Sequence, residues 1–532
     1  MRTLVRSAAL AALLPIAALA IPEGPKYPSP AWASREAANY AHVLQAPTEQ
    51  VTNPTFVTRW GLQSQANFNA VVQRDTQDPS WLLASSPLVN VLVRDASTPR
   101  KLAQALTITV ASIAAHPESG LHVSLNSPLT PLCATWSLPC AGDPFRYPSA
   151  KGPDGAPFYA TQADVVPVTW YDRDCARITG RVWAPKVWTH RLPGIVIENG
   201  SVEAPEPLYW WAAQALVRSG YVVMTFDPRG QGRSDFQSPS FDQGGNVDPS
   251  VFWNGLVDAI DFFRSRPGAV YPRNFACTGL YPTFVMGENP FHARIDPSRL
   301  GIVGHSLGAT GVSVVQGYGA PGADPWPGQL DATNPVKVVV AWDGLSAAGA
   351  DPTSGGGGAL SAIPGLGPIL GSLLKRGQPA VVPRVPAMGH SSEYGLTPTP
   401  FLQPPDPEGK KAAFAAWRDA GVPVFQLAIQ GSSHYEWSLI PAFPASSWCP
   451  DTSTGACRGG WGRPMAEHYT LAWLDRWLKI PGEPGYATAD ARLLDDGGAQ
   501  GRGKMSFYYR SARAYPDRGG HAQHCEDIRA GC

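Results

Sequence analysis

At residues 301–311 the chain has the sequence GIVGHSLGATG. An apolar run that is typical of a buried strand ends in Gly-His-Ser-Leu-Gly, and the residues after it are compatible with a helix. A serine at such a sharp turn is exposed, and glycines two positions away on either side allow the close backbone approach that the turn requires. The helix adds free amides and the positive end of its dipole beneath the serine. We therefore predict Ser306 as a nucleophile.

The pattern around Ser306 is weak by itself, so its context matters. From residue 164 onward, apolar strand-like segments alternate with helical segments, which is typical of a mostly parallel sheet covered by helices on both faces. Helices are predicted at residues 207–220, 251–265, 410–421 and 466–479, where apolar residues recur at helical spacing. Eight strands are predicted, the first two as a hairpin, at residues 165–172, 177–185, 194–200, 221–227, 300–306, 336–343, 384–390 and 422–430.

The chain divides into segments that differ in amino-acid composition. Residues 1–20 carry two arginines, an Ala/Leu-rich run and Ala18-Leu19-Ala20, which predict a secretory signal peptide and no stable membrane anchor. We expect residues 21–160 to form an N-terminal extension with a helix at 99–115, residues 161–480 a catalytic domain, and residues 481–532 a C-terminal appendage. Within the catalytic domain, residues 345–383 are Gly-rich and then apolar, which indicates either a flap over a cleft or a merely packed or disordered insertion.

The eight cysteines all follow residue 20, and their even number agrees with a secreted protein that forms disulfides. Cys175 and Cys277 are left for a long-range bridge once the neighbours in sequence are paired. No Cys-x-x-Cys spacing is present, so no metal site is expected. The three pairs that are close in sequence are Cys133 with Cys140, Cys449 with Cys457, and Cys525 with Cys532.

Charge excludes one class of partner. The chain has 42 basic and 42 acidic residues, a formal net charge of zero, so no nucleic-acid partner is expected. With 44% hydrophobic and 16% charged residues, it can bury a large core.

A serine nucleophile requires a base and an acid that orients the base. Loops at the carboxyl ends of parallel strands converge on one crevice, and His434 is the histidine that directly follows the eighth predicted strand. We predict His434 as the base. Asp343 ends the sixth strand and Glu393 follows the seventh, and either loop can reach the histidine. We favour Asp343 as the acid and keep Glu393 as the alternative.

The oxyanion that forms during attack on a carbonyl needs two amide donors. One is expected from the residue after the nucleophile, Leu307, and the other from the loop after the third strand. That loop has the sequence ENGSVEAPE, so the second predicted donor is the amide of Gly200 or Ser201.

Three segments carry a resemblance to a known group of enzymes. The segment LGIVGHSLGA with IDPSR before it, the turn DPRGQGRSD at 227–235, and GSSHYEW at 431–437 resemble secreted bacterial α/β-hydrolase-fold esterases and lipases. The branches concerned are the dienelactone hydrolases, polyester hydrolases and platelet-activating-factor acetylhydrolases. The resemblance covers about residues 160–480 and implies an eight-stranded sheet and cofactor-free ester hydrolysis. The acid follows the sixth strand in the acetylhydrolase-like branch and the seventh in the polyester-hydrolase-like branch.

We therefore expect a secreted carboxylic-ester hydrolase, with a small-molecule or lipid ester as substrate and no cofactor. Trp210, Trp211, Tyr435 and Trp437 near the expected cleft favour a hydrophobic ester, and the alternative is that these aromatic side chains belong to the core. One alternative is a serine peptidase of the same fold, which would need an anchor for a peptide terminus, such as Glu203 and Glu206. Another is a non-catalytic binding module on a hydrolase scaffold. The sequence leaves the oligomeric state open.

Overall fold

The computed structural model describes residues 24–52, 54, 158–277, 285–347, 377–438 and 462–532, with short gaps at 202–203, 233, 236–237, 241, 243, 245–247 and 397. The predicted signal peptide, the helix expected at 99–115, most of the flap-like insertion, Glu203 and two of the predicted cysteine pairs lie outside the described residues.

The described strands form one sheet of ten, in the order β1-β2-β4-β3-β5-β6-β7-β8-β9-β10. The strands from β4 through β8 in this order pair in parallel, whereas β1, β2, β9 and β10 pair antiparallel. This architecture is the α/β-hydrolase fold, as predicted. The strands are β1 (Ala163–Tyr171), β2 (Arg177–Pro185), β3 (Leu192–Glu198), β4 (Val222–Asp227), β5 (Ile295–His305), β6 (Val336–Trp342), β7 (Ala387–Ser392), β8 (Val424–Ile429), β9 (Ala512–Pro516) and β10 (Ala522–Cys525).

All eight predicted strands are present, but the sheet has ten strands and not the eight that were predicted. The first eight strands have the order expected for the fold, and the C-terminal segment adds β9 antiparallel to β8 and then β10. Residues 512–525 thus continue the sheet.

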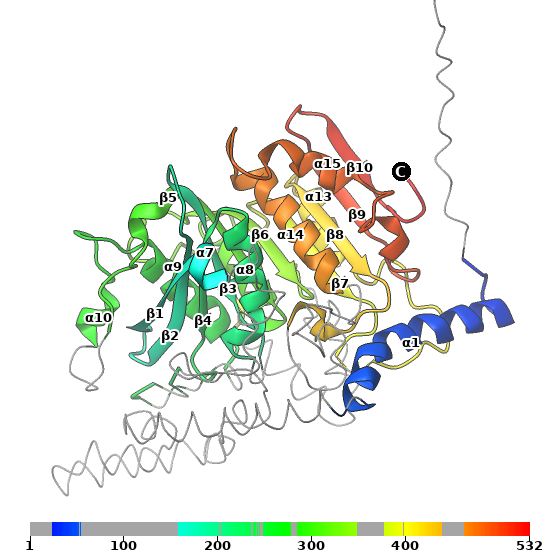
Figure 1. The fold of residues 1–532 in the computed structure, drawn as a ribbon, viewed down its shortest axis with the longest axis horizontal. Helices are drawn as coiled ribbons and strands as arrows, with labels where there is room; N and C mark the ends of the chain where they lie inside the picture. Colours follow the sequence, from blue (N-terminus) through cyan, green and yellow to red (C-terminus); the bar gives the residue numbers. More distant parts are fainter. Residues whose placement is uncertain are drawn as a thin grey trace, which may run out of the picture.

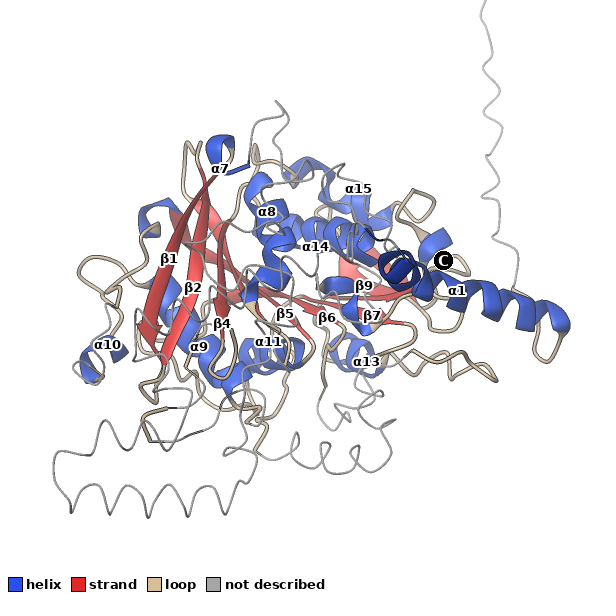
Figure 2. Ribbon diagram, turned by 60° about the horizontal axis from the view of Figure 1, so that its bottom comes forward, coloured by secondary structure: helices blue, strands red, loops and turns tan. Residues whose placement is uncertain are grey.

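Helices cover both faces of the sheet, as predicted. Figure 2 shows α8 (Trp210–Arg218) and α14 (Gly462–Leu478) on one face, and α9 (Val251–Arg264), α11 (Leu307–Gly317) and α13 (Ala412–Asp419) on the other. Each face has its own core of buried apolar side chains. The remaining described helical segments except α1 are α7 (Phe158–Thr161), η4 (Glu206–Tyr209), α10 (Arg273–Ala276), η5 (His292–Arg294), η7 (His434–Trp437), η8 (Tyr486–Thr488), α15 (Ala489–Leu494) and η9 (Arg502–Lys504).

The N-terminal helix α1 (Pro30–Thr52) was not predicted. It starts with a serine cap, since the amide of Trp32 donates to Ser29 Oγ at 3.1 Å, and with a proline in its first turn. In Figure 1 it lies beside the loops that follow β7. Its buried residues recur at helical spacing and combine apolar with polar side chains: Trp32, Glu36, Asn39 and Val43.

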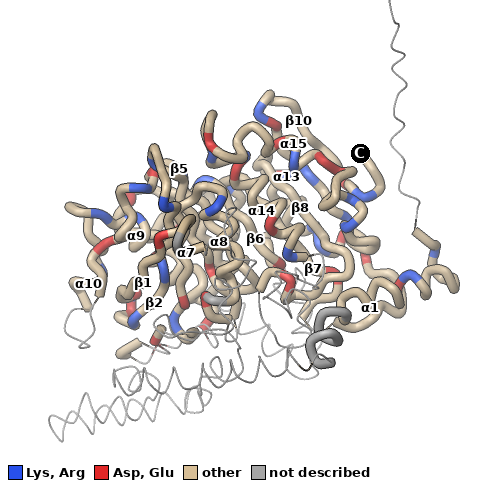
Figure 3. The backbone as a smooth tube through the Cα atoms, in the orientation of Figure 1, with Lys and Arg blue, Asp and Glu red and all other residues tan. Residues whose placement is uncertain are grey.

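Two disulfides are present among the described residues, and both were predicted. Cys175–Cys277 joins residues 102 positions apart, and Cys525–Cys532 closes a loop of the C-terminal segment. Basic and acidic residues are interspersed over the described chain (Figure 3), in agreement with its zero net charge. None of the helices in the described ranges has the length and apolar character needed to cross a membrane.

Candidate active site

Ser306 occupies a strained turn between β5 and α11. Its φ of 59° and ψ of −122° are rare for a residue with a side chain, and such strain is concentrated at functional sites. The amide of Ser306 donates to the carbonyl oxygen of Trp342 at 3.0 Å, which ties the turn to the end of β6. A Cβ on Gly304 would lie 2.2 Å from the carbonyl oxygen of Gly308, so the turn requires glycine there.

The structure brings Asp343 and His434 together. Asp343 directly follows β6, His434 begins η7 after β8, and His434 Nδ1 lies 2.5 Å from Asp343 Oδ2. Because a carboxylate accepts this hydrogen bond, the proton is on Nδ1, which leaves Nε2 able to accept a proton. Burial by itself would raise the pKa of Asp343, but the hydrogen bond and the charge of His434 bring this pKa down to about 2. The carboxylate therefore stays ionised beside His434.

Asp343 is held by further contacts at the end of the sheet. The amide of Ser392 donates to Oδ1 at 2.7 Å and Ser392 Oγ donates to Oδ2 at 2.8 Å. The backbone of Asp343 has a φ of 53°, another unusual value for a residue with a side chain. Both Ser306 and Asp343 thus sit on constrained turns after adjacent strands.

Glu393, the alternative acid, makes its hydrogen bonds elsewhere. It is buried, and its carboxylate accepts from Asn39, Gly431 and Ser506. No bond between Glu393 and His434 occurs among the described contacts. The geometry favours Asp343 as the partner of His434.

A series of hydrogen bonds beside Ser306 connects the backbone of His434 to the amide of Gly200 through His305 and Tyr209. His305 Nε2 lies 2.9 Å from the carbonyl oxygen of His434, which can only accept, so Nε2 carries the proton. His305 Nδ1 therefore accepts from Tyr209 Oη at 2.9 Å, and Tyr209 Oη accepts from the amide of Gly200 at 2.9 Å. Desolvation lowers the pKa of His305 to about 3, so this imidazole is neutral. Sequence reasoning missed Tyr209, because no motif marks it.

The same series of hydrogen bonds determines which of the predicted amides is available as an oxyanion donor. The amide of Gly200 is already paired with Tyr209. In the described part of the chain, no hydrogen bond engages the amide of Ser201. The amide of Leu307, in the first turn of α11, has no partner within its own helix. Of the two donors predicted after β3, the geometry leaves Ser201.

The loop after β3 lies against the nucleophile, and a residue of the turn after β4 forms hydrogen bonds to its backbone. A Cβ on Gly200 would lie 3.2 Å from Ser306 Cβ, so glycine keeps the loop close. Gln231, a residue of the turn DPRGQGRSD, donates through Nε2 to the carbonyl oxygen of Gly200 at 2.7 Å and accepts from the amide of Ala204 at 3.2 Å. This role of Gln231 could not be predicted from the turn alone.

No cluster of three His, Cys, Asp or Glu side chains that could hold a metal ion occurs within the described ranges. The polar groups that the structure places together at the site are Ser306, His434, Asp343 and the neighbouring amides.

Comparison with known proteins gives a distant likeness in structure alone. No protein-family model and no curated protein matches this chain. The acylaminoacyl peptidase of Pyrococcus horikoshii is similar with a TM-score of 0.37 and 13% identity, over 61% of this chain and 44% of that one. An acylaminoacyl peptidase in complex with Z-Gly-Gly-Phe-chloromethyl ketone is similar with a TM-score of 0.38 and 14% identity, over 63% of this chain and 44% of that one. This chain thus spans less than half the length of either structure, and the fold is assigned from the strand order.

Proposed function

We propose that this protein is a serine hydrolase that cleaves carboxylic esters through an acyl-enzyme on Ser306. The observation that carries the proposal is the hydrogen bond between His434 Nδ1 and Asp343 Oδ2, at the sheet edge where the strained Ser306 turn lies. A histidine oriented by a buried carboxylate is the base that a serine hydroxyl needs in order to attack.

The residues act in two half-reactions. His434 Nε2 takes the proton of Ser306 Oγ as this oxygen bonds to the ester carbonyl carbon, and the same proton then goes to the departing alkoxide, which leaves as an alcohol. Water next gives a proton to Nε2 as its oxygen attacks the acyl carbon. When the bond between this carbon and Ser306 Oγ breaks, Nε2 returns the proton to Oγ, which releases the acid and restores Ser306 and His434. Asp343 remains ionised throughout and stabilises the imidazolium that forms in each half-reaction.

The negative oxygen of each tetrahedral intermediate needs preorganised donors. We assign this role to the amides of Leu307 and Ser201. The fixed amides require no reorientation when the charge develops, which is why such donors typically contribute about 10²–10³ in rate. The network of Gly200, Tyr209 and Gln231 holds the loop that carries Ser201.

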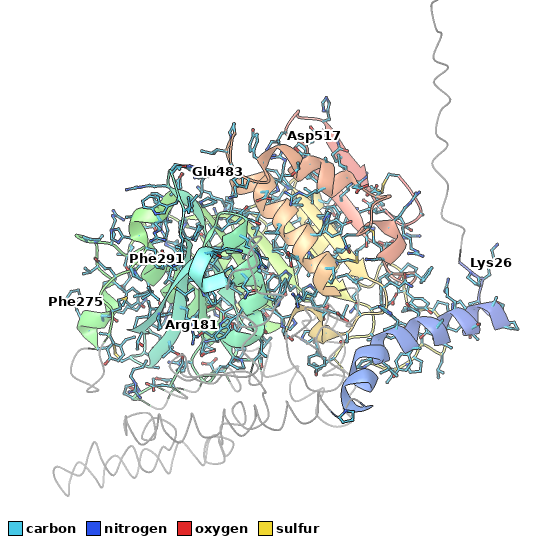
Figure 4. The ribbon with its side chains drawn as sticks, in the orientation of Figure 1. Lys26, Arg181, Phe275, Phe291, Glu483 and Asp517 are labelled. Carbon is cyan, nitrogen blue, oxygen red and sulfur yellow. A yellow bond between two sulfur atoms is a disulfide. The ribbon has the colours of Figure 1, made fainter. Side chains whose placement is uncertain are left out.

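Glu206 bears on the peptidase alternative. This carboxylate is buried, forms an ion pair with Arg181 of β2, and accepts a hydrogen bond from Thr225 Oγ1 at 2.6 Å. Figure 4 labels Arg181 within the body of the molecule. A carboxylate committed in this way does not serve as an anchor for the amino group of a peptide. We therefore favour an ester over a free peptide terminus as substrate.

We also propose that the protein acts outside the cell, which its disulfides support. Trp210, Trp211 and Trp437 are buried core residues, so acyl chain length is left to experiment.

The test is hydrolysis of p-nitrophenyl esters from acetate to palmitate, beside p-nitroanilides of free and N-acylated amino acids, each with wild type and Ser306→Ala. We expect ester hydrolysis that is lost in Ser306→Ala, and little cleavage of the anilides. Cleavage of anilides without cleavage of simple esters would contradict the ester assignment and favour the peptidase. Cleavage of neither would contradict the hydrolase.

A further inference from the structure

Three segments that are far apart in sequence meet at the carboxylate of Glu393. Asn39 Nδ2 of α1 and the amide of Gly431 each donate to Oε2 at 2.6 Å. Ser506 Oγ of the C-terminal segment donates to Oε1 at 2.5 Å. We call Asn39, Glu393, Gly431 and Ser506 the Glu393 junction.

The junction lies beside the loop that carries His434. Two backbone hydrogen bonds join the loop after β7 to the loop after β8: the amide of Tyr394 donates to Ser432 O at 3.0 Å, and the amide of His434 donates to Gly395 O at 2.9 Å. Gly431, the loop member of the junction, is three residues before His434. A displacement at Glu393 is therefore transmitted to His434 through a short, bonded segment.

Helix α1 packs directly onto the same loop. A Cβ on Gly431 would lie 2.7 Å from His42 Cδ2, and Gly431 has a φ of 55°, which favours glycine. Asn39 Nδ2 also donates to Tyr394 Oη at 2.9 Å, and this hydroxyl donates to Glu36 at 3.1 Å. Through these contacts α1, although distant in sequence, is part of the surroundings of His434.

The buried position of the Glu393 carboxylate is stabilised by its hydrogen-bond donors. It is 2% exposed, and its described hydrogen-bond donors are an amide side chain, a backbone amide and a hydroxyl, with no Lys or Arg among them. A buried carboxylate that loses one of few donors is costly to keep in place. Loss of a donor is therefore expected to move the carboxylate and the Gly431 loop with it.

We propose that Glu393 is a positioning residue, which holds the His434 loop against α1 and the C-terminal segment, so that α1 is required for full turnover. This inference rests on the proposed function. Because a misplaced base slows the chemical step more than it weakens substrate binding, the effect is expected in kcat and not in KM.

The test uses the full chain and the p-nitrophenyl ester that the wild type cleaves best. Asn39→Leu removes the donor from α1 and keeps the size of the side chain, and we expect kcat to fall about tenfold with KM within about twofold of wild type. The matched control is Tyr40→Phe on the same helix, which removes the hydrogen bond to Pro398 O and keeps each of the three hydrogen bonds described for the junction. We expect this control to retain wild-type kcat. If Asn39→Leu does not fold, Ser506→Ala removes the donor to Oε1 and carries the same expectation.

Glu393 itself separates a positioning role from a purely structural one. Glu393→Ala should lower kcat at least as much as Asn39→Leu, and Glu393→Gln, which keeps an acceptor oxygen toward Asn39 and Gly431, should restore kcat to within about threefold of wild type. Equal kcat in Asn39→Leu, Glu393→Ala and Tyr40→Phe would overturn the inference, as would variants that melt earlier but turn over normally when folded. A loss of about 10⁴ in Glu393→Gln would also overturn it, since that is the effect of neutralising a triad acid. Full activity of Ser306→Ala would instead overturn the proposed function.

Discussion

The imidazole of His305 is bonded to the main chain of His434: Nε2 donates to the carbonyl oxygen of His434 at 2.9 Å, and the two rings lie 4.7 Å apart. His305 precedes Ser306 in the chain, so a single side-chain-to-backbone hydrogen bond links the residue next to the nucleophile to the backbone of the base. A neutral His305 matters here, because a second cation would oppose the imidazolium that forms on His434 during catalysis.

Tyr209→Phe tests this network. The change leaves His305 Nδ1 and the amide of Gly200 without their partner, so both the His434 segment and the oxyanion loop lose a support. We expect kcat to fall about tenfold and the free energy of unfolding to fall by about 1–3 kcal/mol. The measurements are steady-state kinetics and urea unfolding.

The matched control is Tyr221→Phe, which removes an equally buried hydroxyl that donates to Asp475 Oδ1 at 2.6 Å and lies outside the site. This variant should lose stability and keep its kcat. Equal kcat in the two variants would show that the Tyr209 hydroxyl has no part in arranging the site.

Sequence patterns predict the strands and the nucleophile turn of this molecule better than the segments that pack around the site. Both bounds of β2, the Ser306 turn and the Cys175–Cys277 bridge follow from local patterns or pairing. Helix α1 escaped prediction because its buried stripe includes Glu36 and Asn39, which interrupt the apolar periodicity on which helix prediction relies.

The sequence favours Asp343 over Glu393 only slightly, since the two residues follow adjacent strands of the sheet. Only the contacts differ: Asp343 bonds to His434, whereas Glu393 bonds to α1 and the C-terminal segment. Strands β9 and β10 were missed for a similar reason, because they are short and are defined by pairing with β8 and with each other.

The ion pair of Glu206 with Arg181 leads to a second prediction. Glu206→Gln removes the carboxylate that forms an ion pair with the buried Arg181, which should lower the free energy of unfolding by about 3–5 kcal/mol. Because Glu206 is not available to substrate, KM should stay within about twofold of wild type for esters and for anilides. A raised KM for substrates with a free amino group, at unchanged stability, would contradict this account.

A third prediction concerns pH and His390, which is buried and accepts a hydrogen bond from Trp437 Nε1 at 3.0 Å. Desolvation lowers the pKa of His390 to about 3, whereas an unfolded histidine titrates near 6.5. Between these values the unfolded state binds a proton that the folded state does not, so stability from this group is lost as pH falls.

His390→Gln removes the titration and keeps an acceptor for Trp437. Its stability relative to wild type should therefore rise as pH falls from about 6.5 to about 4, by up to about 1.4 kcal/mol per pH unit. Urea unfolding of both proteins at several pH values measures this difference. A difference that does not change with pH would contradict a neutral buried His390.

A fourth prediction compares the two described disulfides. Cys175–Cys277 closes a loop of 102 residues and Cys525–Cys532 a loop of 7, so the longer loop restricts the unfolded chain more. Replacing both cysteines of a pair by alanine should cost about 4.7 kcal/mol for the first and about 2.5 kcal/mol for the second, by loop-closure entropy. A larger loss from the shorter loop, measured by urea unfolding, would show that native contacts outweigh this entropy.

The central claim is tested most directly by reaction with a fluorophosphonate, followed by peptide mass spectrometry, for wild type, Ser306→Ala and Asp343→Asn. We predict a covalent adduct on Ser306 in the wild type, none in Ser306→Ala, and a labelling rate at least about 10³-fold lower in Asp343→Asn, because His434 would lose its orienting carboxylate. An adduct on another residue, no adduct in the wild type, or unchanged labelling of Asp343→Asn would contradict the assignment of Ser306, His434 and Asp343.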